Sequence, residues 1–341
     1  MDNINNVSSS PKVTKETKNK IRVDFERTSL WERIKIKYFN SNFAITFLWK
    51  LLRLVLLIGI SYIILFPFFT KITTSFMSGD DFVDATVKLI PKYPTLDTYK
   101  AIIRDNGFFT ALTNSTLLSL ACAVIQTIVC SMIGYGFAKF KFKGSKLLFA
   151  LVILTMIVPH GTLKFSMFMK FRYFDIYGLF KLFGLKQIDM INSYWPLIIL
   201  SLTGLGFKNG LYIFMMRQFF KGIPDELEES AYIDGYGCVK TFIKIIIPLS
   251  VPMMITVFLF SFAWQWTDNF YTKLFFTTVG PKLMPSIIAI PKSLDTTMAP
   301  SMFSAAVNNA CAILIILPLI IIYLFCQKFL VQGIERSGIT G

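Results

Sequence analysis

The chain has 341 residues, of which 54% are hydrophobic and only 16% are charged, and its formal net charge is +15. An ordinary soluble domain carries about 25% charged residues, so this composition excludes a soluble enzyme and a disordered chain and predicts several membrane spans. The positive charge does not indicate nucleic-acid binding, because it must first be placed relative to the bilayer.

Residues 1–50 form an N-terminal extension, whose first 30 residues are polar and lack the apolar core of a signal peptide. Two interpretations fit the extension. It is either a partly disordered cytoplasmic tail, or its segment Trp31–Tyr38 starts an amphipathic helix that lies on anionic lipid. Residues 51–110 would then hold the first span and an outer loop, and residues 111–341 the remaining spans.

A helix that crosses a bilayer needs about 20 mostly apolar residues. Six segments qualify, which predicts an all-α membrane protein with six transmembrane helices. They are Leu54–Thr70, Thr116–Phe137, Leu147–Met169, Tyr194–Met216, Ile245–Trp264 and Ala305–Cys326.

The basic residues predict how these spans are oriented. Of the 35 Lys and Arg residues, 21 lie on the side that holds both termini and 13 lie on the other side. Because loops rich in Lys and Arg remain in the cytoplasm, we expect both termini to be cytoplasmic in a multi-pass protein of a bacterial cell membrane. An even number of spans also requires both termini to lie on the same side of the membrane, so the span count agrees with the charge distribution.

The first outer loop tests an enzymatic alternative. Its segment Asp80–Asp84 has the D-D-x-x-D spacing with which membrane prenyltransferases hold magnesium and diphosphate. Those enzymes need a second acidic cluster, which the sequence lacks, so this class is disfavoured. His160 has no Cys or carboxylate at ligand spacing, and we expect no metal site and no disulfide.

The segment 217–252 predicts a short helix in a cytoplasmic loop. Pro224 suits a first helical turn, and four carboxylates follow at Asp225, Glu226, Glu228 and Glu229, where the helix dipole favours negative charge. Gly235 is placed to end the helix in a left-handed cap. A short two-sided helix of this kind suits docking into a cleft on a partner.

This loop resembles the EAA loop of ABC importer permeases. Glu229-Ser230-Ala231 is followed after three residues by Gly235 and after nine more by Ile245-Ile246-Ile247-Pro248. The chain departs from the family pattern at Ser230 and Ile247, and both changes keep the size class. In the family this is the coupling helix, which sits in a groove of the cytoplasmic ATPase. The resemblance implies that the loop 217–248 contacts the ATPase through Glu229, Ser230, Ala231, Asp234 and Gly235.

Further segments resemble the carbohydrate branch of the family, the maltose-type second permease. They are Pro94–Tyr99, the form Trp266-Thr267-Asp268-Asn269-Phe270 of its W-N-D-F segment, and the closing tail 327–333. The resemblance implies a MetI-like, type I ABC importer core over residues 111–341. It also implies inward passage of a carbohydrate, such as an oligosaccharide, by alternating access.

The implied partners are a sister permease, two cytoplasmic ABC ATPases, an extracellular solute-binding protein and membrane lipid, with no nucleic acid. ATP and magnesium would be bound by the ATPases, so this chain would be neither an enzyme nor a cofactor-binding protein. It has no G-x-x-x-x-G-K-[ST] motif for a P-loop. Importers of another solute (phosphate, polyamine or molybdate), or an ATP-independent transporter or channel, are the alternatives.

Polar and aromatic residues in or near the spans are candidates for the substrate path, each with a structural alternative. Lys208 either snorkels or packs in the fourth span, or lines the path. The aromatic and polar residues near the end of the fifth span either form an interfacial belt or bind sugar rings, and amides in the sixth either join helices or contact substrate. The candidates are Lys208, Trp264, Trp266, Asp268, Asn269, Asn308 and Asn309.

Overall fold

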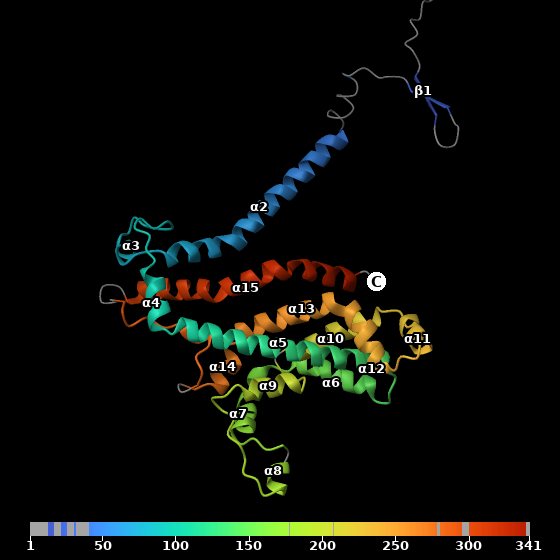
Figure 1. Cartoon of the computed structure of the whole chain (residues 1–341). Helices are drawn as coiled ribbons and strands as arrows, with labels where there is room; N and C mark the ends of the chain where they lie inside the picture. The colour runs from blue at the N-terminus through green and yellow to red at the C-terminus, as the bar shows by residue number, and fades with distance from the viewer. Residues whose placement is uncertain are drawn as a thin grey trace, which may run out of the picture. The chain divides into compact units, whose positions relative to one another are not determined.

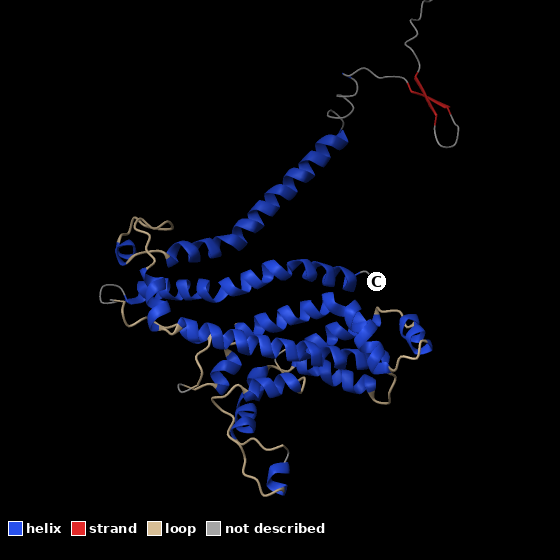
Figure 2. Cartoon of the chain, in the orientation of Figure 1, coloured by secondary structure: helices blue, strands red, loops and turns tan. Residues whose placement is uncertain are grey.

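The computed structural model describes residues 13–16, 22–25, 31, 41–176, 178–206, 208–277, 280–294 and 300–338. Helices make up almost all of it (Figure 2), and the chain divides into two compact units, Met1–Phe69 and Thr70–Gly341. Of the segment Trp31–Tyr38, for which an interfacial helix is one interpretation, all but Trp31 lies outside the described residues.

The first unit contains the two strands of the described chain, which the all-α prediction missed. Strand β1 (Val13–Glu16) pairs antiparallel with β2 (Arg22–Phe25), so that Val13 lies opposite Phe25 and Glu16 opposite Arg22. Apolar and opposite-charge pairs across strands stabilise such a ladder. The unit continues into α2 (Ser41–Ser75), which is apolar around its circumference, as expected of a helix in lipid.

Four helices in the described residues are long and apolar enough to cross a membrane. They are Ile45–Ser75, Phe108–Lys139, Cys238–Trp266 and Ser304–Leu330, and they contain the first, second, fifth and sixth predicted spans. A bent pair, Ser145–Ile157 and His160–Arg172, adds a fifth if it is counted as one span. The predicted count of six is therefore not reproduced by these residues.

The third predicted span is bent at Pro159. Helix α6 (Ser145–Ile157) ends just before it, and η1 (His160–Leu163) and α7 (Lys164–Arg172) follow at 93° to α6. A proline lacks the N–H that would continue the helical ladder, and it biases the preceding residue towards extended conformations. Val158 adopts such a conformation, with ψ of 120°.

The fourth predicted span is two short helices instead of one. Helix α9 (Trp195–Leu202) and α10 (Asn209–Lys221) are separated by a segment in which Gly204 and Lys208 both have positive φ, 71° and 65°. Two left-handed residues within five positions cannot continue an α-helix. Neither helix is long enough to cross a bilayer by itself.

The second unit is built around α5 (Phe108–Lys139), which packs against α10 and against α13 (Ile247–Trp266), while α13 packs against α15 (Pro300–Gly338). Figure 1 shows α3 and α4 at one end of this bundle and α11 at the other. The remaining elements are α3 (Gly79–Val83), α4 (Asp97–Asp105), α8 (Leu179–Leu182), α11 (Glu226–Ile233), α12 (Cys238–Thr241), the π-helical turn η2 (Phe242–Ile246), α14 (Phe270–Phe275) and η3 (Met284–Ile287).

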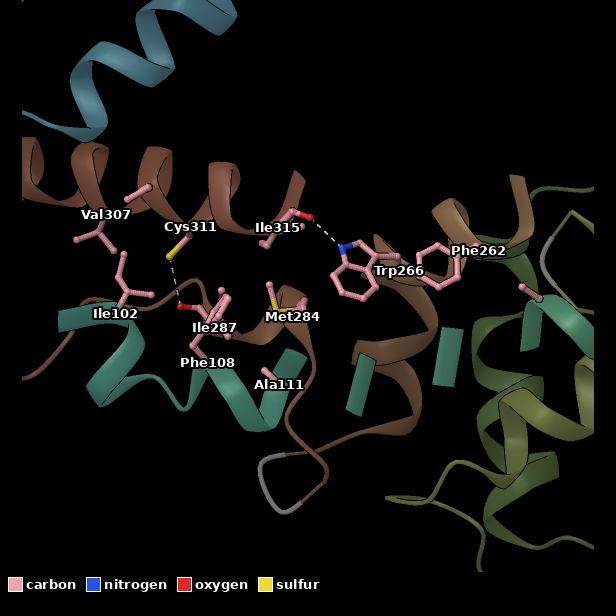
Figure 3. Close-up of a cluster of buried hydrophobic side chains, with 12 residues drawn as sticks. Ile102, Phe108, Ala111, Phe262, Trp266, Met284, Ile287, Val307, Cys311 and Ile315 are labelled. Atoms are coloured by element: carbon pink, nitrogen blue, oxygen red, sulfur yellow. Dashed lines mark hydrogen bonds between the residues drawn. The ribbon is translucent and has the colours of Figure 1, made fainter. Parts of the chain in front are cut away.

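One buried apolar cluster joins α4, α5, α13, η3 and α15. Figure 3 shows Trp266 with its indole Nε1 directed at the Ile315 carbonyl of α15, at 2.9 Å, and with Phe262 stacked beside it. Met284 and Ile287 of η3 are completely buried in the same cluster. The connection between α14 and α15 is thereby fixed to the bundle.

Candidate functional site

The eight-residue helix α11 presents most of its predicted contact residues to the outside. It starts at Glu226, two residues after Pro224, and Glu229, Ser230 and Asp234 are exposed. Ile233 is 87% exposed, the highest value among the large hydrophobic residues whose side chains the structure describes. Exposed apolar side chains that are rimmed by carboxylates are typical of a protein–protein contact surface.

Gly235 ends α11 as the sequence predicts. Its φ is +80°, the Tyr236 N–H donates to the Ala231 carbonyl at 2.9 Å, and its own N–H donates to the Tyr232 carbonyl at 3.0 Å. These two bonds form a Schellman motif, which a left-handed glycine permits. A Cβ at Gly235 would meet no atom within 4 Å, so the space around this turn is open in the chain itself.

The inner face of α11 consists of Glu228 and Ala231, three residues apart. Ala231 is 2% exposed and Glu228 is 7% exposed, so both point into the bundle. Ala231 was expected on the face that docks to a partner, together with Ser230. The helix instead turns Ala231 inward, and Ser230 remains exposed.

Lys139, the last residue of α5, holds this loop in place. Its Nζ donates to the Ile223 carbonyl at 2.6 Å and to Asp225 Oδ1 at 2.5 Å, and it lies 3.6 Å from Glu228 Oε1. The Lys139 side chain is 6% exposed and that of Glu228 is 9% exposed. A cation and a carboxylate at this burial are stabilised by each other, and the loss of either leaves an uncompensated charge.

Asp225 is at the exposed rim of this contact. The hydrogen bond and the positive charge of Lys139 lower the pKa of the Asp225 carboxyl below its usual value. Because the pKa is lowered by folding, the stabilisation is complete above the ordinary aspartate pKa of about 3.9 and is lost only as the pH falls towards the folded-state value. The contact is thus fully formed at neutral pH.

A cluster of aromatic rings lies next to the contact between Lys139 and Glu228. The Tyr135 hydroxyl of α5 donates to Glu228 Oε2 at 3.3 Å, and its ring lies 4.6 Å from Phe242 of η2 and 5.6 Å from Phe220 of α10, between centroids. Tyr135 is 4% exposed and Phe220 is completely buried. Helix α11 is therefore bonded to α5 through Glu228, and the Tyr135 ring connects that contact to α10 and to the helix that leads into α13.

The candidate path residues separate into two groups. Lys208 and Trp264 lie together, with Lys208 Nζ 4.9 Å from the centroid of the indole ring, and Trp264 is 45% exposed. Asn269 and Asn308 are also exposed. Lys208 is the left-handed residue directly before α10, where the fourth predicted span is broken.

The other candidates make contacts inside the chain. Trp266 is 1% exposed and bonded to α15. Asp268 accepts the N–H groups of Phe270, Tyr271 and Thr272 at 3.1, 3.2 and 2.8 Å and so caps α14. Asn309 donates to Thr74 Oγ1 at 2.8 Å and accepts from Lys71 at 3.2 Å, which joins α15 to the end of α2.

The acidic segment between α2 and α4 stabilises its own fold. Asp81, 2% exposed, accepts the backbone N–H groups of Ser78, Lys92 and Tyr93. Asp84 accepts the Thr86 N–H and the Lys92 ammonium. These two carboxylates of the D-D-x-x-D spacing are therefore engaged in turn formation.

Comparison with known proteins identifies the family. The profile of the family described as "binding-protein-dependent transport system inner membrane component" matches residues 130–336. The chain belongs to this family. The match includes α11, its anchor at Lys139 and the broken segment before α10.

Individual relatives cover most of this inner membrane component. The galactooligosaccharides transport system permease protein GanQ of Bacillus subtilis is 30% identical over 84% of the chain and 94% of its own length. The trehalose transport system permease protein SugB of Mycobacterium tuberculosis is 28% identical over 74% of the chain and 85% of its own length. A crystal structure of a bacterial ABC transporter involved in the import of the acidic polysaccharide alginate has the same fold, with a TM-score of 0.64, 20% identity, and coverage of 90% of this chain and 100% of that one.

The sequence did not reveal several residues that organise this inner membrane component. Lys139, Tyr135 and Glu228 form the anchor of α11, and the basic cluster after α5 gave no reason to single out Lys139. Gln126 was also missed. It links α5 to two other helices, donating to Ser201 Oγ at 3.0 Å and accepting from Ser261 Oγ at 2.5 Å. Its amide inside an apolar span is the sequence signal by which Gln126 could have been found.

Proposed function

We propose that the chain is the membrane permease subunit of an ATP-driven importer of carbohydrate, and specifically of an oligosaccharide. The observation that carries the proposal is α11, an acidic helix that exposes Ile233 on one face and is bonded to α5 through Glu228 on the other. The substrate class is supported by relatives whose names specify galactooligosaccharides, arabinooligosaccharides and trehalose. The chain would not itself hydrolyse ATP.

The exposed face of α11 would contact a cytoplasmic ATPase. Glu229 and Asp234 would make polar contacts, Ile233 would enter an apolar part of the groove, and the absence of a side chain at Gly235 would permit close approach. ATP and magnesium would be bound by two such ATPases. Closure of the ATPases on ATP can change the permease only through contacts that differ between the two states, and α11 would carry these contacts.

The anchor would convert a displacement of α11 into motion of the spans. Glu228 of α11 is bonded to Tyr135 of α5, and the Tyr135 ring packs on Phe220 and Phe242. A push on α11 would therefore reach α5 and, through Tyr135, α10 and the helix continuing into α13. Packed interiors transmit such displacement as rigid-body movement, because they resist compression. Alternating access would follow from this movement of the bundle relative to a sister permease.

Lys208 and Trp264 would line the solute path. A broken membrane helix exposes backbone groups that can face a solute inside the bilayer, where continuous helices satisfy their own. The half-exposed indole of Trp264 offers a flat apolar face of the kind that stacks on sugar rings. An extracellular solute-binding protein would deliver the oligosaccharide, and both termini would be cytoplasmic.

The test is reconstitution of the chain with its sister permease, its ATPase and its binding protein in proteoliposomes. Uptake of a radiolabelled oligosaccharide that requires both ATP and the binding protein is the expected result. Uptake that continues without ATP would overturn the proposal in favour of a secondary transporter or channel. Uptake of a different solute class alone would overturn the carbohydrate assignment and leave the importer assignment intact.

A charge introduced on α11 tests the ATPase contact separately. Ile233→Asp places a carboxylate at the most exposed apolar position, and we expect loss of ATPase co-purification together with loss of uptake. The matched control is Ile90→Asp, because Ile90 is 71% exposed in the first outer loop, at the opposite end of the bundle. Retention of the ATPase by the Ile233→Asp permease would contradict the role of α11.

A further inference from the structure

The connection between α7 and α9 forms an outer projection with an unusual composition. Residues 176–188, named the outer foot here, hold eight apolar or aromatic side chains and two lysines, and no Asp or Glu. All are described except Tyr177. The proposed function makes no use of this segment, and a water-exposed loop is rarely so apolar.

The outer foot has a defined structure of its own. Phe174 and Ile188 exchange backbone hydrogen bonds of 2.9 and 3.1 Å at its base, and the Leu185 N–H donates to the Phe180 carbonyl at 2.8 Å. The stacked rings of Phe171 and Phe174 connect its base to the buried cluster below. The base is thus fixed, and the side chains at the tip point outward from an ordered turn.

The tip exposes apolar surface that its own fold does not cover. Leu182 is 79% exposed, Phe183 is 70% exposed and Leu185 is 60% exposed. Ordering a loop so that it presents three large apolar side chains to water is unfavourable by the free energy of transferring that surface. This surface therefore requires a cover.

The charged residues of the outer foot indicate which kind of molecule would bury these apolar side chains. Lys181 and Lys186 at the tip are exposed, while each of the two acids that flank the foot has a partner within the chain. Asp175 is 8% exposed and accepts the Phe180 N–H, and Asp189 pairs with Arg172 at 2.8 Å. An outward surface of apolar side chains and lysines is complementary to anionic phospholipid, whose headgroups are negative and whose chains are apolar.

The direction in which the outer foot projects agrees with burial in phospholipid. Helix α7 is bent by 93° from α6, and Figure 1 shows α7 and α8 leaving the bundle sideways, across the direction of α5, α13 and α15. If those long helices cross the bilayer, the outer foot extends along its plane. A loop that reaches into water, towards a soluble partner, would instead continue in the direction of the helices.

We propose that the outer foot is an interfacial anchor that lies in the headgroup region of the outer leaflet and binds anionic phospholipid there. Leu182, Phe183 and Leu185 would enter the boundary between headgroups and acyl chains. Lys181 and Lys186 would contact phosphate groups. The proposal depends on the membrane fold of the chain and not on which solute it carries.

The experiment measures the depth of a nitroxide label at Phe183→Cys in the assembled transporter, in nanodiscs of phosphatidylcholine and phosphatidylglycerol. Cys238 and Cys326 are partly exposed and are replaced by Ser, while the other three cysteines are buried. Relaxation by oxygen and by a water-soluble nickel chelate should place the label about 5–10 Å into the headgroup–acyl boundary. The control label is at Lys100→Cys on α4, whose side chain is 76% exposed, and should be accessible to nickel.

Two results would overturn the proposal. A label at residue 183 that is as accessible to nickel as the label at residue 100 would place the foot in water. A label shielded from both reagents in the assembled transporter, but not in the isolated chain, would show that the foot is covered by a protein subunit.

Lipid specificity is tested by replacing the tip lysines. Native mass spectrometry should show less retained phosphatidylglycerol for the double variant Lys181→Gln, Lys186→Gln, with each lysine contributing about fivefold in lipid preference. The control pair is Lys88→Gln, Lys100→Gln, which removes the same charge from the first outer loop. An equal loss of lipid from both double variants would contradict a specific role of the outer foot.

Discussion

Lys139 at the end of α5 lies 2.5 Å from Asp225, 86 residues later, at the entrance to α11. The same ammonium group approaches the buried carboxylate of Glu228. One lysine thus connects α5, the helix around which the bundle is built, to the helix that would contact the ATPase. The contact suggests how force applied at the surface of the bundle reaches its interior.

Removal of the Lys139 charge should release α11. In Lys139→Met, Glu228 keeps its hydrogen bond from Tyr135 but loses the only cation recorded beside it in the described chain. Breaking a buried ion pair from one side typically costs about 3–5 kcal/mol. We expect faster hydrogen exchange over residues 222–236 and loss of most ATP-dependent uptake, with the bundle still folded in the membrane.

Lys143→Met is the matched control for that variant. Lys143 is an exposed residue of the same basic loop, and its replacement should change neither exchange nor uptake. Glu228→Gln should be milder than Lys139→Met, because the amide retains a partner for Tyr135 and carries no charge. Equal exchange rates in Lys139→Met and wild type would show that the anchor is unimportant.

Gly235 has two separable roles, in the turn and in access to the surface. Asparagine tolerates a left-handed backbone better than other side chains, and Gly235→Asn would project into space that is open in this chain. We expect Gly235→Asn to leave the cap of α11 protected from exchange while it weakens ATPase binding and uptake. A β-branched residue, as in Gly235→Val, should cost a further 1–2 kcal/mol, approximately, by straining the turn.

Co-purification of the ATPase and hydrogen exchange at Tyr236 distinguish these roles. If Gly235→Asn binds the ATPase as wild type does, the glycine serves only the turn. If the Tyr236 amide of Gly235→Asn also loses protection from exchange, the substitution has changed the turn. ATPase binding is then compared between wild type and Gly235→Ala instead. Full uptake by Gly235→Val would argue against any role for this position.

Trp264 and Trp266, two residues apart, should respond differently to the same change. Trp266→Phe removes the donor to the Ile315 carbonyl and leaves a buried acceptor, at a cost of about 1–3 kcal/mol. Its thermal unfolding temperature should fall, whereas the concentration of oligosaccharide for half-maximal uptake should not change. Trp264→Phe should show the reverse pattern, because its half-exposed indole stabilises little of the fold.

The sequence predicted what is determined locally. The acidic first turn of α11 and the left-handed glycine at its end are both readable within ten residues, and both are found. The anchor at Lys139 was not predictable, because four lysines lie within residues 139–146 and only the folded loop selects one. Likewise, nothing in the local pattern distinguishes the buried Trp266 from the exposed Trp264.

The broken fourth span shows a limit of averaged hydropathy. Residues 194–216 are apolar enough to count as one span, and an average over that length does not register the glycines around Lys208. Lys208 lies in this segment with φ of 65°, between two glycines that neighbouring side chains approach closely. A Cβ at Gly206 would lie 3.0 Å from Gln126 Nε2, and one at Gly210 would lie 2.6 Å from Thr155 Oγ1, so both neighbours press closely on this segment.

Asp268 should stabilise the outer part of the bundle by capping α14. Its carboxylate accepts three consecutive backbone N–H groups, and α14 carries Tyr271 and Phe275, which are 2% and 0% exposed. Loss of a capping side chain typically costs about 0.5–2 kcal/mol. In Asp268→Ala we therefore expect the amides of residues 270–272 to exchange up to roughly 30-fold faster, since 1.4 kcal/mol corresponds to a factor of ten.

The control is Asn269→Ala, an exposed neighbour that should leave these amides protected. If Asp268→Ala kept these exchange rates but abolished uptake, the carboxylate would belong to the solute path and not to the cap.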